Sequence, residues 1–237
     1  MIQFYAPDFQ KNRTLPEAES GHCVRVLRHS VGDTIHVVDG KGTRYEAVIV
    51  DDYPKHVTCD ILSTQSVPNH WGKRIVLAVA PTKNIDRMEW LFEKATEIGI
   101  DEIIPLHCEH SERKILKTDR LDKILVSAMK QSLKGIKPVL REMTSFNSLL
   151  KEEFKGQKFI AYCADDVERH NFACEIRPGD DVLILIGPEG DFSPSEARSA
   201  IEKGFIPVSF GESRLRTETA ALFAVQTIHI INQLNKC

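Results

Sequence analysis

Two stretches in the C-terminal part of the chain combine glycine with charged side chains directly after apolar runs. Residues 186–191 read Ile-Gly-Pro-Glu-Gly-Asp and follow the apolar residues 182–185. Residues 210–220 read Phe-Gly-Glu-Ser-Arg-Leu-Arg-Thr-Glu-Thr-Ala and follow the strand-like residues 205–209. Ligands of α/β proteins bind at the carboxyl ends of strands. We therefore predict that these two loops form a ligand site.

The residue types in the two loops exclude some classes of ligand but do not identify the ligand. Gly187 and Gly190 allow the backbone to approach a ligand closely or to adopt a positive φ. The spacing matches neither Gly-x-Gly-x-x-Gly nor a loop ending in Gly-Lys-Ser/Thr, which disfavours a dinucleotide or a nucleoside triphosphate. A purely structural turn is the alternative for residues 187–191. Glu218 is expected in the first turn of the last helix, where an acid also stabilises the helix dipole, so its role stays open.

Alternating strands and helices are predicted to position these loops. Residues 75–80 and 182–186 are continuous apolar runs, as in strands buried on both faces. Between residues 88 and 98 apolar side chains recur at helical spacing. The Ser-Pro-Ser-Glu sequence at residues 193–196 predicts a helix start with a capping box. This alternation favours an α/β domain with a mostly parallel sheet.

The first part of the chain has a different pattern and is predicted to form a small β-barrel. Three runs between residues 34 and 62 are rich in β-branched side chains and have strand length. Residues 17–28 are expected to form a short helix that closes the barrel, with Arg25 and Arg28 one turn apart on one face. A barrel of this size is a common RNA-binding module, although a fold alone does not establish a function.

A linker separates the two patterns. Residues 65–72 contain Pro, Asn and Gly, and the strand pattern stops before them and restarts after them. We therefore predict a barrel domain at residues 1–68 and an α/β domain at residues 73–237.

The charge is unevenly distributed along the chain. The formal net charge is −3, yet residues 113–141 carry 9 Lys and Arg against 2 Asp. Such a local excess can attract the phosphates of a nucleic acid. The alternative is a solvated helix face.

Other features bear on location and metal binding. No apolar run approaches the ~20 residues needed to span a bilayer, and the N-terminus lacks the pattern of a signal peptide. We therefore expect a cytoplasmic protein that does not associate with a membrane. Six cysteines are scattered without a Cys-x-x-Cys pair, which favours reduced thiols. The sequence His-Cys-Glu-His at residues 107–110 matches no structural zinc pattern, so no metal is expected.

Several motifs together resemble a known family. Gly-Pro-Glu-Gly at residues 187–190, with Leu-Arg-Thr-Glu-Thr-Ala at residues 215–220, resembles the SPOUT methyltransferases, whose chain forms a trefoil knot. The resemblance is closest to the ribosomal RNA small subunit methyltransferase E family. Further matching motifs, in family order, are His-Cys-Val-Arg-Val-Leu-Arg at 22–28, Lys-Ala-Thr-Glu-Ile-Gly at 94–99, Ser-Glu-Arg at 111–113 and Lys-Gln-Ser at 130–132.

The resemblance implies a fold and an activity. The fold would be α/β, with a SPOUT-type trefoil-knotted parallel-sheet domain preceded by a small PUA-like β-barrel that helps to hold RNA. The activity would be methyl transfer from S-adenosylmethionine to N3 of a uridine in 16S ribosomal RNA, at the position numbered 1498 by convention. A homodimer with the site near the subunit interface is also implied.

The resemblance also implies which residues form the site. Arg216 would stabilise the developing uridine anion, and Glu218 would orient that arginine or accept the proton. Three loops would hold the cofactor, largely through their backbone: Cys163, Ala164, Asp165, Ile186, Gly187, Pro188, Glu189, Gly190, Phe210, Gly211, Leu215 and Arg216.

A second set of residues is expected to bind RNA. Gln131 is a candidate for a contact to the base, and Lys134 stands where the family commonly has an arginine. The expected phosphate contacts are Arg25, Arg28, Arg113, Lys114 and Arg120.

One further departure from the family pattern, and two other functions, remain open at this point. Asp191 stands where the family commonly has a second glycine, and it would either narrow the pocket or cap the following turn. One alternative function is a SPOUT enzyme that acts on another RNA or on a ribose 2′-OH. The other is a ribosome-assembly factor that binds RNA without catalysis.

Overall fold

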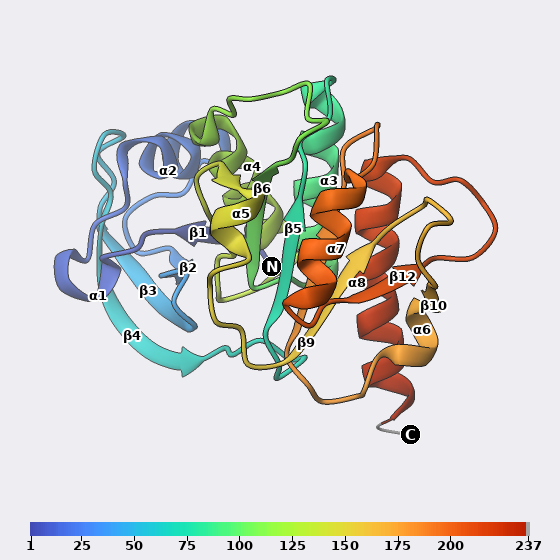
Figure 1. Cartoon of the computed structure of the whole chain (residues 1–237). Helices are drawn as coiled ribbons and strands as arrows, with labels where there is room; N and C mark the ends of the chain where they lie inside the picture. Colours follow the sequence, from blue (N-terminus) through green and yellow to red (C-terminus); the bar gives the residue numbers. More distant parts are fainter. Residues whose placement is uncertain (236–237) are drawn as a thin grey trace. The chain divides into compact units, whose positions relative to one another are not determined.

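The computed structural model describes residues 1–235, which divide into two units (Figure 1). The first unit comprises Met1–His70 together with Leu125–Lys137. The second comprises Trp71–Ile124 and the residues from Pro138 onward. The predicted division of the chain at residues 69–72 stays a prediction, and residues 125–137 add a later segment to the first unit.

The first unit is built on a four-stranded sheet in the order β1-β2-β3-β4. The strands β2, β3 and β4 pair antiparallel, whereas β1 lies parallel to β2. Side chains on one face of the sheet pack into a core with Phe4, Phe9 and Tyr45, because alternate strand residues point to the same side. The strands are β1 (Gln3–Tyr5), β2 (Thr34–Val38), β3 (Thr43–Asp51) and β4 (Thr58–Ser66), and the helices are α1 (Phe9–Asn12), α2 (Glu17–Gly21) and η1 (His22–Val26).

One expectation for this unit was wrong. Arg25 and Arg28 do not share a helical face, because the helical segment is a π-helix that ends at Val26. Arg28 lies beyond that end with a φ of 61°, in the left-handed region. The two arginines therefore do not lie one turn apart on a regular helix.

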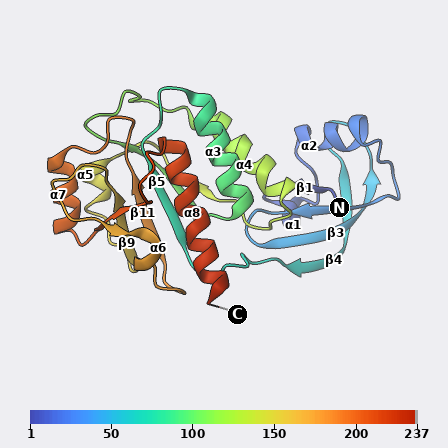
Figure 2. The same ribbon diagram turned by 90° about the vertical axis from the view of Figure 1, so that its right-hand side faces the viewer.

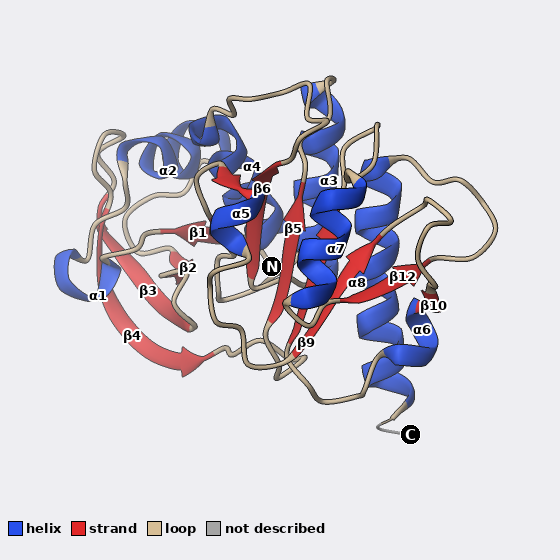
Figure 3. Ribbon diagram, in the orientation of Figure 1, coloured by secondary structure: helices blue, strands red, loops and turns tan. Residues whose placement is uncertain are grey.

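The second unit contains a parallel sheet, as predicted (Figure 3). Its strands lie in the order β10-β12-β9-β11-β5-β6-β7, with β8 paired to β6. All five residues of β11 and of β5 are buried, which confirms the interpretation of their apolar runs. The strands are β5 (Ile75–Val79), β6 (Glu102–His107), β7 (Val139–Leu140), β8 (Thr144–Ser145), β9 (Gln157–Ala161), β10 (His170–Asn171), β11 (Val182–Ile186) and β12 (Ile206–Ser209).

Helices cover both faces of this sheet. Figure 2 shows α5 and α7 on one side of the strands and α3 and α8 on the other. The predicted capping box of α7 is present, with Ser193 and Glu196 bonded reciprocally. The helices are α3 (Ile85–Ile98), α4 (Thr118–Gln131), whose residues from Leu125 onward belong to the first unit, α5 (Phe146–Leu149), α6 (Phe172–Glu175), α7 (Pro194–Glu202) and α8 (Thr217–Leu234).

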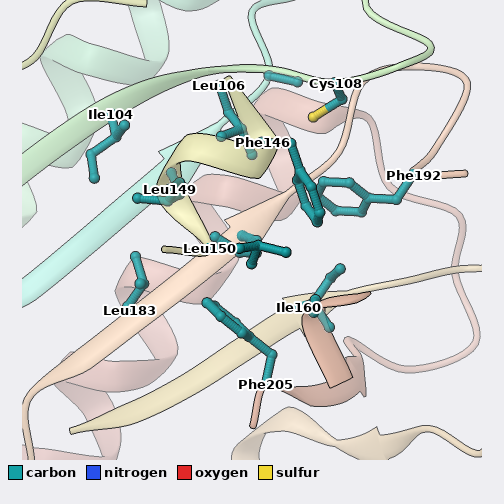
Figure 4. Close-up of a cluster of buried hydrophobic side chains, with 14 of the residues drawn as sticks. Ile104, Leu106, Cys108, Phe146, Leu149, Leu150, Ile160, Leu183, Phe192 and Phe205 are labelled. Atoms are coloured by element: carbon teal, nitrogen blue, oxygen red, sulfur yellow. The ribbon is translucent and has the colours of Figure 1, made fainter. Parts of the chain in front are cut away.

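A cluster of buried side chains fills the space between the sheet and α5 and α7 (Figure 4). Phe192 packs against Phe146, with ring centroids 5.5 Å apart. Since Phe192 directly follows the loop at residues 187–191, this contact anchors the loop at its far end. No helix among residues 1–235 is long and apolar enough to cross a membrane.

Candidate active site

A cavity of about 880 Å³ opens where three neighbouring strands of the second unit end. The strand order places β9 between β12 and β11, so the loops that follow these parallel strands meet at one edge of the sheet. The start of α8 and Arg87 from α3 complete the lining. Every residue predicted to hold a cofactor lines this cavity except Asp165, whose side chain pairs with Arg169 instead.

The loop after β11 is held tightly from several sides. A Cβ atom at Gly187 would lie 3.1 Å from the Phe192 ring, so a side chain at this position would crowd the ring. The Gly187 carbonyl accepts a hydrogen bond of 3.1 Å from the Thr217 hydroxyl, which ties this loop to the start of α8. Glu189 Oε1 accepts a bond of 3.1 Å from the Lys83 backbone N–H. The loop therefore has a fixed shape, as a preorganised ligand site requires.

Asp191 both caps its own turn and joins two loops. Its φ of 64° is in the left-handed region, which Asp tolerates better than most residues other than glycine. Its Oδ1 accepts from the Phe192 N–H and its Oδ2 from the Cys163 N–H, both at 2.8 Å. Partial desolvation, followed by the charge of Asp191, raises the pKa of the Cys163 thiol.

His110, in the turn after β6, contacts the same loop. Its Nδ1 lies 3.1 Å from the carbonyl oxygens of Gly190 and Asp191, so Nδ1 carries a proton and donates to them. Across residues 1–235, no group of three or more His, Cys, Asp or Glu side chains is arranged to hold a metal ion.

The first turn of α8 contains a buried acid. Glu218 is 7% exposed, and its Oε1 lies 3.6 Å from Nε of Arg87. Its Oε2 is buried without a hydrogen-bond partner in the described structure. Arg216 is the exposed N-cap residue of α8 and lines the cavity, but the arginine paired with Glu218 is Arg87.

Sequence reasoning missed Arg87. It carries no motif and lies inside an amphipathic helix, so the local pattern gives no signal. A signal exists only in the sheet topology: α3 follows β5, which neighbours β11, and the N-terminus of α3 therefore lies at the same sheet edge as the cavity.

The residues expected to bind RNA fall into both units and differ in their freedom to contact a ligand. Arg113 donates to the carbonyl oxygens of Thr82 at 3.1 Å and Lys83 at 2.6 Å, so its guanidinium braces the loop after β5. Arg120 pairs with Glu89 at 2.7 Å. Lys114 is exposed in the second unit; Arg25, Arg28 and Gln131 are exposed in the first, and Lys134 there is half-buried.

Comparisons with known proteins match both parts of the chain. The model of an RNA methyltransferase domain matches residues 69–229, and the model of an RNA methyltransferase PUA domain matches residues 15–62. The predicted fold class is thereby confirmed as a PUA-like domain followed by a parallel α/β methyltransferase domain; the trefoil knot stays a prediction.

Individual relatives agree with these matches. Ribosomal RNA small subunit methyltransferase E of Aquifex aeolicus is 28% identical over 96% of this chain and 99% of its own, and that of Bacillus subtilis is 25% identical over 91% and 89%. The crystal structure of a probable rRNA-methyltransferase from Porphyromonas gingivalis is 45% identical over 99% of this chain and all of its own, with a TM-score of 0.94. The structure of ribosomal RNA small subunit methyltransferase E from Neisseria gonorrhoeae bound to S-adenosyl methionine is 26% identical over 98% of each chain, with a TM-score of 0.85.

Proposed function

The chain belongs to the RNA methyltransferase family, and from this premise we propose that it transfers a methyl group from S-adenosylmethionine to N3 of a uridine in the 16S RNA of the small ribosomal subunit. The observation that carries the proposal is the cavity at the carboxyl ends of β9, β11 and β12, into which the family motifs at residues 187–190 and 215–220 converge. Residues 1–68 would form the RNA-holding domain and residues 73–237 the catalytic one.

The cavity fits the cofactor on its own chemistry. Its volume of about 880 Å³ suits a ligand of this size, and its lining combines apolar residues such as Ile186, Phe210 and Leu215 with polar ones, as the binding of a nucleoside requires. Buried Glu218 contributes an oxygen without a partner, which indicates that a ligand donor completes it. When bound, S-adenosylmethionine supplies a methyl group already activated by its sulfonium.

The protein's own residues must then align and deprotonate the base. Uridine N3 carries a proton at neutral pH, so its reaction needs a base or an electrostatic aid to ionisation. We assign proton acceptance to Glu218, whose Oε2 has no hydrogen-bond partner among the described residues. We assign stabilisation of the uracil anion to Arg216, whose cation stands at the positive N-terminal end of α8.

RNA would be held mainly by exposed cations. Arg25, Arg28 and Lys114 are exposed and can contact phosphates, which position an RNA without reading its sequence. Arg113 and Arg120 already bond to groups of the protein, so we assign them a weaker role in RNA binding. We assign a contact with an RNA base to Gln131. To Lys134 we assign the positive charge that the family commonly supplies with an arginine at this position.

A second copy of the chain is the proposed partner of α8. Phe223, Ile230 and Leu234 lie on one face of this helix, and 45%, 43% and 66% of their surfaces are exposed. An exposed apolar stripe of this kind is typical of an interface between proteins. Because α8 begins at the cavity, a homodimer formed through this face would lie close to the site. We place the enzyme in the cytoplasm, where ribosomal subunits are assembled.

The proposal is tested by methylation in vitro. Purified protein would be incubated with labelled S-adenosylmethionine and small subunits that lack the modification, and the nucleosides would be analysed by mass spectrometry. Label in N3-methyluridine is expected. Label in a 2′-O-methylated nucleoside or in another RNA, or RNA binding without any transfer, would overturn it in favour of the other SPOUT activities or of an assembly factor.

The residue assignments need a separate test. Arg216→Ala and Glu218→Gln should each lower the turnover number by at least about tenfold while S-adenosylmethionine still binds in calorimetry. Near-normal turnover in both variants would contradict the assignment.

A further inference from the structure

The ion pair between Arg87 and Glu218 places a buried charge in the wall of the cavity. Glu218 is in the first turn of α8, and Arg87 is in the first turn of α3. Their closest atoms, Nε and Oε1, are 3.6 Å apart, and both residues line the cavity. The side chain of Arg87 is 36% exposed and that of Glu218 only 9%. The pair therefore connects the two helices at the position where a ligand would bind.

Only one of the two carboxylate oxygens of Glu218 faces Arg87, and the other lacks, within residues 1–235, a hydrogen-bond donor that a ligand could supply. Oε1 faces the guanidinium, whereas Oε2 is buried and has no hydrogen-bond partner among the described residues. A buried carboxylate oxygen without a donor is strongly unfavourable, so such groups occur mainly where function requires them. The side chain of Glu218 faces the Arg87 cation and lies in the first turn of α8, at the positive end of the helix dipole.

A purely structural ion pair explains these contacts less well. The helices α3 and α8 are in contact, and both carry fully buried apolar residues, such as Leu91 and Phe92 on α3 and Ala224 and Ile228 on α8, so a charge pair is not needed to bury them. A buried pair is also seldom a net source of stability. What the pair does supply is a carboxylate whose Oε1 faces a cation and whose buried Oε2 has no hydrogen-bond partner among residues 1–235.

We propose that Arg87 is a positioning residue for the methyl-transfer reaction, which acts by orienting the carboxyl group of Glu218 with Oε2 directed at the N–H donor of the base. This inference rests on the proposed function. In the step that it serves, the N3–H bond of uracil breaks, an O–H bond forms at Oε2, and the electron pair stays on the uracil ring. Glu218 later returns the proton to water. Arg87 itself touches no reacting atom.

A double-mutant cycle tests this role. Single-turnover methylation would be measured for the wild type, Arg87→Ala, Glu218→Gln and the double variant. Arg87→Ala should lower the rate by about tenfold or more and leave the dissociation constant of S-adenosylmethionine within about threefold, and Arg87→Lys should restore part of the rate. In the Glu218→Gln background, Arg87→Ala should add less than about a twofold loss, because the residue through which it acts is already disabled.

A second readout uses the cofactor-free protein. If the Arg87 cation offsets the buried charge of Glu218, Arg87→Ala should lower the thermal midpoint by more in the wild-type background than in the Glu218→Gln background. Lys94→Ala is the matched control for the rate measurements of the double-mutant cycle, because Lys94 also pairs with acids on α3 but does not line the cavity. That variant should retain the wild-type rate.

The outcomes separate this inference from the function on which it rests. Suppose that the wild type is active and that Arg87→Ala and Glu218→Gln lower the single-turnover rate independently, so that their effects multiply. This result would overturn the role of Arg87 but not the proposed function. So would an Arg87→Ala variant with the wild-type rate, or one whose whole loss comes from weaker cofactor binding. A wild type that forms no N3-methyluridine would overturn the proposed function itself.

Discussion

Asp191 accepts a hydrogen bond of 2.8 Å from the backbone N–H of Cys163, and this bond joins the loop after β11 to the loop after β9. The same carboxylate accepts from the N–H of Phe192, so one side chain fixes two sides of the cavity. The position also requires a left-handed backbone, with a φ of 64°. Asp191 therefore adopts a left-handed backbone and at the same time accepts two specific hydrogen bonds.

Substitutions at Asp191 should separate the bond from the backbone requirement. Asp191→Ala loses both hydrogen bonds and keeps the strain of a left-handed backbone, so cofactor binding should weaken by about tenfold. Asp191→Gly loses the bonds but relieves the strain and should bind more tightly than the alanine variant. Asp191→Asn keeps one acceptor oxygen and should lie nearest the wild type. Calorimetry with S-adenosylmethionine measures the order, and equal affinities for all four proteins would exclude this role for the Asp191 bond.

Cys163 should report on occupancy of the cavity. Because desolvation and the Asp191 charge raise its pKa, little of this thiol is ionised at neutral pH, and its alkylation by iodoacetamide should be slow there. The rate should rise about tenfold per pH unit until the pH reaches the pKa, since only the thiolate reacts. S-adenosylmethionine should protect Cys163.

Cys174 provides the internal control for that experiment. It is exposed but does not line the cavity, so the cofactor should leave its alkylation rate unchanged. Peptide mass spectrometry resolves the two sites. Equal protection of both cysteines, or of neither, would contradict the placement of the cofactor.

The apolar face of α8 should hold the homodimer together. Phe223→Glu places a charge where 45% of the residue's surface is exposed in the single chain, so it should disrupt an apolar interface, and it also removes the contact of this ring with Phe210. Light scattering should report a dimer for the wild type and a monomer for this variant. Val139→Glu is the control, because Val139 is similarly exposed but lies outside α8. A variant at Phe223 that stays dimeric would place the interface elsewhere.

The exposed cations Arg25 and Lys114 should contribute more to RNA binding than Arg120, whose guanidinium forms an ion pair with Glu89. Arg25→Ala and Lys114→Ala should each weaken binding to 16S RNA and reduce the slope of log affinity against log salt by about 1. Arg120→Ala should have a smaller effect, because Glu89 already neutralises that guanidinium. Filter binding over a range of salt concentrations measures the slopes, and identical slopes for all variants would contradict these phosphate contacts.

Local patterns predicted the elements and the loops of the site, but not the pairings across elements. The buried run of β11 and the capping box at Ser193 depend on neighbouring residues, so the sequence alone reveals them. The partner of Glu218 depends on β5 lying next to β11, an order that chain position does not give. The left-handed backbone of Arg28 was likewise not predicted, because arginine is not a residue type that favours a positive φ.

The most direct test of the central claim is mass spectrometry of 16S ribosomal RNA from cells that lack this protein. The account predicts that one N3-methyluridine disappears, that the wild-type chain restores it, and that Glu218→Gln does not. An unchanged content of N3-methyluridine in those cells would contradict the account.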